Sequence, residues 1–279
     1  MKKLVILMCA VTMLFTSCSN TTDDVVIPAE KGTITLRFNP YTMSSMTRAD
    51  DPTKLSTWCK HLDVWIINDT DTIDIHKSSD LATVSVDLDI TKTYRLYAIA
   101  HRCDDDAILA NNVISFPENK ITHSFFYTTT FSPGTSTSLN CVMQRIVGKF
   151  VMTTTDVLPD EVAKFSYTIT ETNTKYNVTS GGINKESRSG TINLTNKNND
   201  GTASINIYVI NDNNDDTQDY TITISALTET DDIVETRTFT DVTMKNNYVT
   251  TYRGTFFVTT EMSIGFSCTD WSSFDIVDF

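Results

Sequence analysis

Most of this chain alternates between apolar and polar residues with a period of two. The run TVSVDLDI, at positions 83–90, puts four aliphatic side chains on one face and polar side chains on the other. This alternation is typical of half-buried strands in antiparallel sheets, and Thr, Val, Ile and aromatic residues fit such strands well. The same pattern predicts strands in TITLRF (33–38), KFSYTIT (164–170), ASINIYVI (203–210) and YTITISAL (220–227).

Turn residues separate these runs, and helical periodicity is scarce. Asp200 and Gly201 form a strong hairpin-turn signal. The main helix we expect is short and lies within DPTKLSTWCKHL, at 51–62, where Pro52 suits a first helical position. Many short strands with few helices predict an all-β chain built from antiparallel β-sandwiches.

The length of 279 residues leaves room for two domains of ordinary size. Loop-rich sequence between Cys103 and Ser138 closes one group of strands, and a new group begins soon afterwards. We therefore expect one β-sandwich at 32–139 and a second at 140–279, with the boundary near Asn140.

The first residues have the layout of an export signal. Lys2 and Lys3 precede an apolar run from Leu4 to Phe15, which is shorter than the roughly 20 residues that span a bilayer. The run ends in FTSC, which resembles the bacterial lipoprotein pattern, in which such a cysteine becomes the acylated first residue. We expect a signal peptide at 1–17, lipid such as palmitate on Cys18, and a flexible tether at 18–31.

The net charge of −13 restricts the partners. An acidic chain without a basic patch does not bind nucleic acid well, because it cannot neutralise phosphates. It is equally unsuited to electrostatic docking on anionic lipid. Attachment to a membrane would therefore be covalent, through the lipid on Cys18.

The remaining cysteines leave two alternatives open. An exported chain can oxidise four thiols in three different pairings, but unpaired buried thiols fit the sequence equally well. No cysteine or histidine spacing matches a zinc site. The four cysteines are Cys59, Cys103, Cys141 and Cys268.

The sequence shows no catalytic constellation, so we expect a protein that is not an enzyme and has neither cofactor nor metal. No histidine stands in a nucleophile motif or at metal-ligand spacing, and each is expected to be an ordinary surface or strand residue. The acidic run at 104–106 is expected to be a solvated loop, with a weak cation site as the alternative. The four histidines are His61, His76, His101 and His123.

Several motifs, taken in order, resemble the fimbrillin superfamily of Bacteroidetes, and within it the FimB/Mfa2-like fimbrial subunits. They are GTITLRFNPY with LDVWIIND, then YRLYAIAH, then MQRIVGKFVM with NNYVTTYRGTFF. The family often has Asn at the end of the strand that corresponds to YRLYAIAH, where this chain has His101. The resemblance implies two tandem transthyretin-like sandwiches in a pilus component of the outer membrane, with other fimbrial subunits as partners.

Family shaft subunits are cut after an arginine, which sheds the lipid and the first strand, and a strand of the next subunit fills the groove. The stretch SMTRADDP offers such a maturation site between Arg48 and Ala49, although a solvated loop arginine is the alternative. An anchor subunit must avoid this cut, because the cut would release it from the membrane.

Three functions follow from the sequence. We favour an outer-membrane lipoprotein that acts as the anchor or assembly base of a fimbria and joins its partners by β-strand complementation. The first alternative is a shaft or tip pilin matured at Arg48, which could donate its tail, residues 262–279. The second is a surface lipoprotein that binds host or bacterial glycans or proteins, with tryptophans to stack on sugars: Trp58, Trp65 and Trp271.

Overall fold

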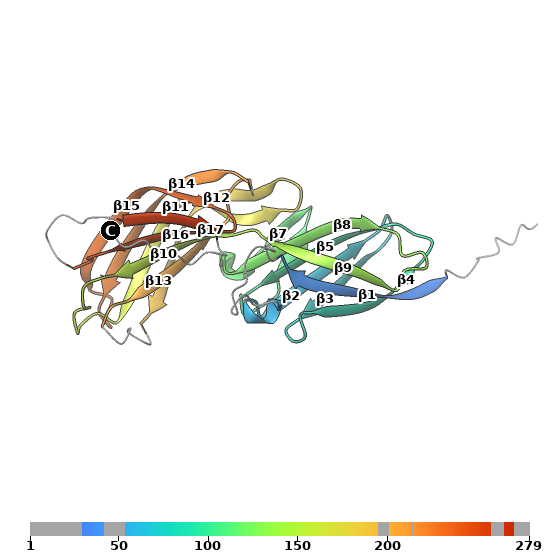
Figure 1. The fold of residues 1–279 in the computed structure, drawn as a ribbon, viewed down its shortest axis with the longest axis horizontal. Coiled ribbons are helices and arrows are strands. Elements are labelled where there is room, and N and C mark those ends of the chain that lie inside the picture. The colour runs from blue at the N-terminus through green and yellow to red at the C-terminus, as the bar shows by residue number, and fades with distance from the viewer. Residues whose placement is uncertain (1–29, 42–53, 195–200, 214, 258–264, 271–279) are drawn as a thin grey trace, which may run out of the picture.

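The computed structural model describes residues 30–41, 54–194, 201–213, 215–257 and 265–270 (Figure 1). Strands dominate these residues, which confirms an all-β chain. The helix expected at 51–62 is only a three-residue 3-10 turn, η1 (Leu55–Thr57), because the residues from His61 onward pair as a strand with neighbours on both sides. A second 3-10 turn is η2 (Pro117–Asn119).

A seven-stranded sheet forms the first lobe, at the right of Figure 1, and has the order β3-β2-β5-β8-β9-β1-β4. Strands β8 and β9 share only two paired positions, so the sheet bends there and both of its parts line one apolar core. Its strands are β1 (Lys31–Pro40), β2 (His61–Ile67), β3 (Thr72–Lys77), β4 (Thr83–Asp89), β5 (Tyr94–His101), β8 (Ser124–Phe131) and β9 (Ser138–Arg145).

Strand β1 lies inside this sheet and not at its edge. It pairs antiparallel with β4 and parallel with β9. The alternation in the sequence directs Ile34, Leu36 and Phe38 into the core, where each is at most 2% exposed. The predicted first strand therefore completes the core of its own lobe.

Two further sheets enclose a second core (Figure 1). The smaller has the order β13-β10-β16-β17, and the parallel pair β10 and β16 repeats the pairing of β1 with β9. Its strands are β10 (Gly148–Thr154), β13 (Ser204–Val209), β16 (Tyr248–Gly254) and β17 (Gly265–Asp270). The larger sheet contains β11 (Lys164–Asn177), β12 (Gly181–Asn193), β14 (Thr217–Leu227), β15 (Ile233–Lys245) and two strands from the first half of the sequence.

Those two strands, β6 (Ile108–Ala110) and β7 (Val113–Ser115), form a hairpin that joins the lobes. Strand β7 pairs with β11, so a segment that follows β5 in sequence belongs to the sheet of the second lobe. A third apolar cluster fills the junction, and the chain crosses it at Ile146 and Val147, which are both fully buried.

The expected boundary near Asn140 falls inside β9, which belongs to the seven-stranded sheet. The chain passes to the next sheet after Arg145, where β9 ends, and β10 begins at Gly148. The division into two domains stays a prediction, since the buried junction and the β6–β7 hairpin make the lobes share structure.

Cys59, Cys103 and Cys141 are buried free thiols, which agrees with the unpaired alternative for these three residues. Burial raises the pKa of Cys141 to about 12. Within the described part of the chain, the helical turns are far too short to cross a bilayer.

Candidate functional site

The residues that the sequence singled out for processing, Cys18, Arg48 and Ala49, lie outside the described residues. The structure instead assembles polar side chains that sequence reasoning treated as ordinary. His61 and Asp63 share one face of β2, His76 stands opposite Asp63 on β3, and His101 stands opposite His61 on β5.

Asp63 is a fully buried carboxylate that takes part in three hydrogen bonds. Its Oδ1 is 2.7 Å from His76 Nδ1. Its Oδ2 accepts hydrogen bonds from His101 Nε2 at 2.8 Å and from the backbone N–H of Ala107 at 2.9 Å. These partners offset the cost of burying the carboxylate, which is large for an unpaired group.

The proton on His101 is placed by its second contact. Its Nδ1 accepts a hydrogen bond from the backbone N–H of Cys103 at 3.2 Å. Nε2 must therefore carry the proton that His101 donates to Asp63. The ring of His101 stacks on that of His61, with 5.5 Å between their centroids, so the two imidazoles fix each other's orientation.

His76 has a raised pKa. Partial burial acts in the opposite direction, but the hydrogen bond to Asp63 and the charges of Asp63, Asp106 and Asp74 outweigh it. The side chain of His76 keeps 37% of its surface exposed, so the cluster is open to solvent on this side.

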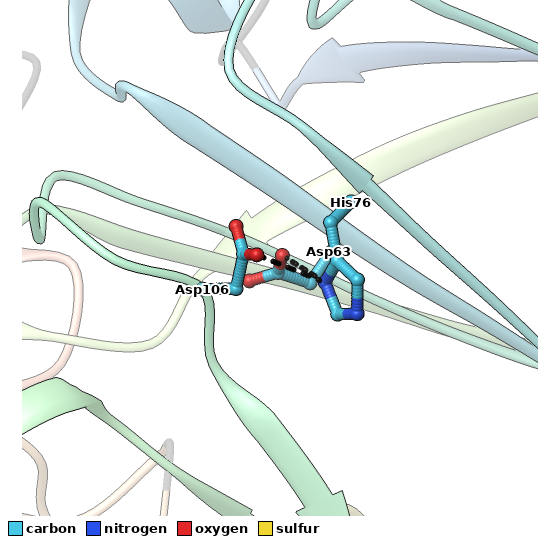
Figure 2. Close-up of side chains that lie close together, drawn as sticks. All are labelled: Asp63, His76 and Asp106. Atoms are coloured by element: carbon cyan, nitrogen blue, oxygen red, sulfur yellow. Dashed lines mark hydrogen bonds and ion pairs between the residues drawn. The ribbon is translucent and has the colours of Figure 1, made fainter.

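Asp106 brings a second carboxylate to the cluster from the loop between β5 and β6. Its Oδ1 lies 3.0 Å from His61 Nδ1, and its Oδ2 lies 4.0 Å from His76 Nδ1. Figure 2 shows Asp63, Asp106 and the imidazole of His76 facing one another. One ligand atom from each lies within 4.8 Å of the other two. The arrangement offers one imidazole nitrogen and two carboxylate oxygens to a cation.

Register counting could have found part of this cluster. A short turn at 68–71 pairs Ile67 with Thr72, and four further steps along each strand place Asp63 opposite His76. The sequence predicts a solvated loop around Asp106. Asp106 is indeed half exposed, but its approach to β2 and β3 depends on the path of that loop.

His123 belongs to a different group, at the junction of the lobes. Its Nε2 is 2.7 Å from the hydroxyl of Tyr208 on β13. Burial, followed by the charges of Arg145, Lys149 and Arg102, lowers the pKa of His123 to about 3. Burial also raises the pKa of Tyr208 to about 12. Both groups are therefore neutral at ordinary pH, and a hydrogen bond joins the Tyr208 hydroxyl to His123 Nε2.

Of the tryptophans considered for sugar stacking, the two that the structure describes, Trp58 and Trp65, are not open platforms. Trp65 is 3% exposed. Trp58 packs against His123 and lies beneath the guanidinium of Arg145, 5.1 Å from its ring centroid. Trp271 lies outside the described residues.

A cleft of about 470 Å³ opens beside the junction. Tyr127 and Gln144 of the first lobe line one side, and Thr179 and Ser180 of the second lobe line the other. The mixture of a tyrosine ring with amide and hydroxyl groups is suited to a polar ligand such as a sugar.

The fold is similar to that of proposed adhesins of Bacteroides. Neither family models nor curated proteins match this sequence. Among solved structures, a proposed cell adhesion protein from Bacteroides ovatus matches with a TM-score of 0.53 and 12% identity, over 90% of this chain and 100% of the other. A proposed adhesin from Bacteroides thetaiotaomicron matches with a TM-score of 0.53 and 10% identity, over 88% and 99%.

A third structure, of proposed polysaccharide-binding proteins from Bacteroides thetaiotaomicron, matches with a TM-score of 0.51 and 8% identity, over 84% of this chain and 95% of the other. At these identities the likeness establishes a shared fold. It agrees with the fold that the fimbrillin resemblance implied, and the adhesins among these proteins are of a non-enzymatic kind.

Proposed function

We propose that this protein is a fimbrial subunit on the cell surface, held in the outer membrane by lipid on Cys18 and acting as the anchor or assembly base. The observation that carries the proposal is the adhesin fold, shared over 90% of the chain. The lipoprotein-like FTSC sequence supports the membrane attachment.

The anchor proposal leaves β1 in place, whereas the alternative of a shaft pilin removes it. A cut after Arg48 would separate β1 from the rest of the chain, and β1 is the internal strand between β4 and β9. Ile34, Leu36 and Phe38 would leave the core with it. A subunit that keeps β1 has its first lobe complete and keeps its lipid.

The proposed joint to the next subunit is made by strand complementation. An incoming strand gains backbone hydrogen bonds along an open sheet edge, and its alternate side chains set the register. Each apolar side chain that it buries contributes ~1.5–3 kcal/mol, so a few such positions make a durable joint. In this proposal the end of the protein remote from the lipid engages the first shaft subunit.

The decisive experiment is to determine the N-terminus and intact mass of the protein taken from its native membrane. We expect an acylated chain that begins at Cys18, with processing blocked by globomycin and by the substitution Cys18→Ser. A native chain that begins at Ala49 would refute the anchor proposal and support a pilin matured at Arg48. A ladder of SDS-resistant oligomers would point the same way.

Glycan binding is a second candidate function, favoured by the cleft at the junction. Tyr127 offers a partly exposed ring there, with Gln144 and Ser180 as polar neighbours. A glycan array with the native protein and with Tyr127→Ala tests it. Binding that is lost in the variant supports this site, whereas equal binding by both proteins, or none, rejects it.

A further inference from the structure

Three side chains from separate segments converge on one small volume beside β2 (Figure 2). They are Asp63 on β2, His76 on β3 and Asp106 on the loop after β5, and their ligand atoms lie within 4.8 Å of one another. We propose that these three residues bind one divalent transition-metal ion of the zinc class.

The donor set selects this class of ion. Imidazole nitrogen together with carboxylate oxygen suits zinc and its first-row neighbours. Calcium instead takes six to eight oxygen ligands, and magnesium demands octahedral oxygen geometry. Three protein ligands on a partly exposed site leave one position of a tetrahedron for water.

Both carboxylates are already oriented as metal ligands usually are. His101 and the backbone N–H of Ala107 hold Oδ2 of Asp63, and its Oδ1 is directed at His76. His61 holds Oδ1 of Asp106, and its Oδ2 is the oxygen nearer to His76. Each carboxylate thus uses one oxygen on a histidine and turns the other toward the shared volume.

Charge at the cluster also favours a cation. Asp63 and Asp106 face the volume directly, and Asp74 adds its field to His76 from β3. The nearby cation Lys60 is engaged with Asp104 at 2.6 Å. A divalent ion would balance the negative charge of the two carboxylates that face this volume.

A bound ion would connect the lobes. Asp106 lies just before the hairpin of β6 and β7, and β7 pairs with β11 of the second lobe. Linking Asp106 to β2 and β3 would hold the start of this crossing segment against the first lobe. An ion that binds only the folded protein raises its stability by linkage.

The test uses the full-length protein, without an affinity tag, in detergent after treatment with a chelator. We expect one Zn²⁺ per chain in a competition titration, and a higher melting temperature with Zn²⁺. Bound Co²⁺ should give the visible absorption of a four-coordinate site without thiolate charge-transfer bands, since no cysteine is a ligand.

Two variants and one control assign the site. His76→Gln and Asp106→Asn alter half-exposed side chains, and each should weaken Zn²⁺ binding by ~10-fold or more. Asp105→Asn changes the exposed residue next to Asp106 and should leave binding unchanged. Urea unfolding in the absence of metal verifies that each variant is folded. If His76→Gln does not fold, the binding measured for Asp106→Asn decides whether the site exists.

The proposal is overturned if the wild-type protein binds no stoichiometric Zn²⁺. It is also overturned if folded Asp106→Asn binds as tightly as wild type, or if bound Co²⁺ shows thiolate bands. In each of these cases the cluster is a hydrogen-bonded structural group that fixes the loop after β5.

Discussion

Phe38 provides a direct measure of how strongly β1 holds the first lobe together. Its side chain is 1% exposed and packs in the core that both parts of the seven-stranded sheet enclose. Replacing a buried Phe by Ala removes its transfer free energy and leaves a cavity, at a cost of about 3–5 kcal/mol. That is a large fraction of the 5–15 kcal/mol by which ordinary domains are stable.

Urea unfolding followed by tryptophan fluorescence measures this cost, since Trp58 and Trp65 both report on the first lobe. The matched control is Arg37→Ala, because Arg37 is the preceding residue and points to solvent on the other face; it should change stability by no more than about 0.5 kcal/mol. A loss of less than about 1 kcal/mol in Phe38→Ala, or equal losses in both variants, would refute the packing of β1 in the core.

The same reasoning gives the loss of stability that proteolytic maturation would cause. Cleavage after Arg48 and loss of β1 would remove Ile34 and Leu36 together with Phe38, at ~1.5–3 kcal/mol each from burial alone. The sum approaches the whole stability of a domain. A cut chain would therefore need a replacement strand to keep its first lobe folded.

Three further predictions follow from burial and backbone geometry. Unfolded His123 takes up a proton below its ordinary pKa of 6.5, whereas the folded residue does so only near 3. Acidification from pH 7.5 to pH 5 therefore lowers the free energy of unfolding by ~2 kcal/mol. His123→Gln should abolish this part of the pH dependence when unfolding by denaturant is measured at both pH values. A variant with the same pH dependence as the wild type would contradict the prediction. Burial raises the pKa of the thiols of Cys59 and Cys141. Neither thiol should therefore react with iodoacetamide in the native protein, which peptide mapping measures. Labelling at the rate of an exposed thiol would be inconsistent with their burial. Gly181 has φ +99° and its Cβ would lie 2.4 Å from a backbone oxygen, so Gly181→Ala should cost about 2–4 kcal/mol in urea unfolding. Gly134→Ala, with φ +51° and open space around it, should cost only about 1–2 kcal/mol, and equal losses would reject the close approach at Gly181.

The strand pattern was predictable because a half-buried strand must alternate. The run TITLRF lies within β1 and TVSVDLDI covers β4, with the aliphatic residues turned inward as expected. The short helix predicted within 51–62 is reduced, over its described residues, to the turn η1 for a tertiary reason. The run HLDVWII gains partners on both sides as β2, and that pairing overrides a weak local preference.

The polar cluster illustrates what a single strand pattern leaves out. Asp63 reads as one polar residue in an apolar run, and only the pairing of β2 with β3 and β5 brings His76 and His101 to its oxygens. Asp106 comes from a loop whose path no local rule specifies. Tertiary packing brings these residues together although they are distant in the sequence.

From the sequence alone one obtains the all-β class, the inward-facing residues of the main strands, the acidic charge and the lipoprotein-like start. These are properties of composition and of short-range periodicity, which a chain carries before it folds. Only the tertiary structure decided that β1 lies between β4 and β9, that the hairpin of β6 and β7 pairs with β11, and that two carboxylates meet His76. Those features depend on contacts between residues distant in sequence, and such contacts are selected by the burial of whole surfaces, which no local pattern encodes.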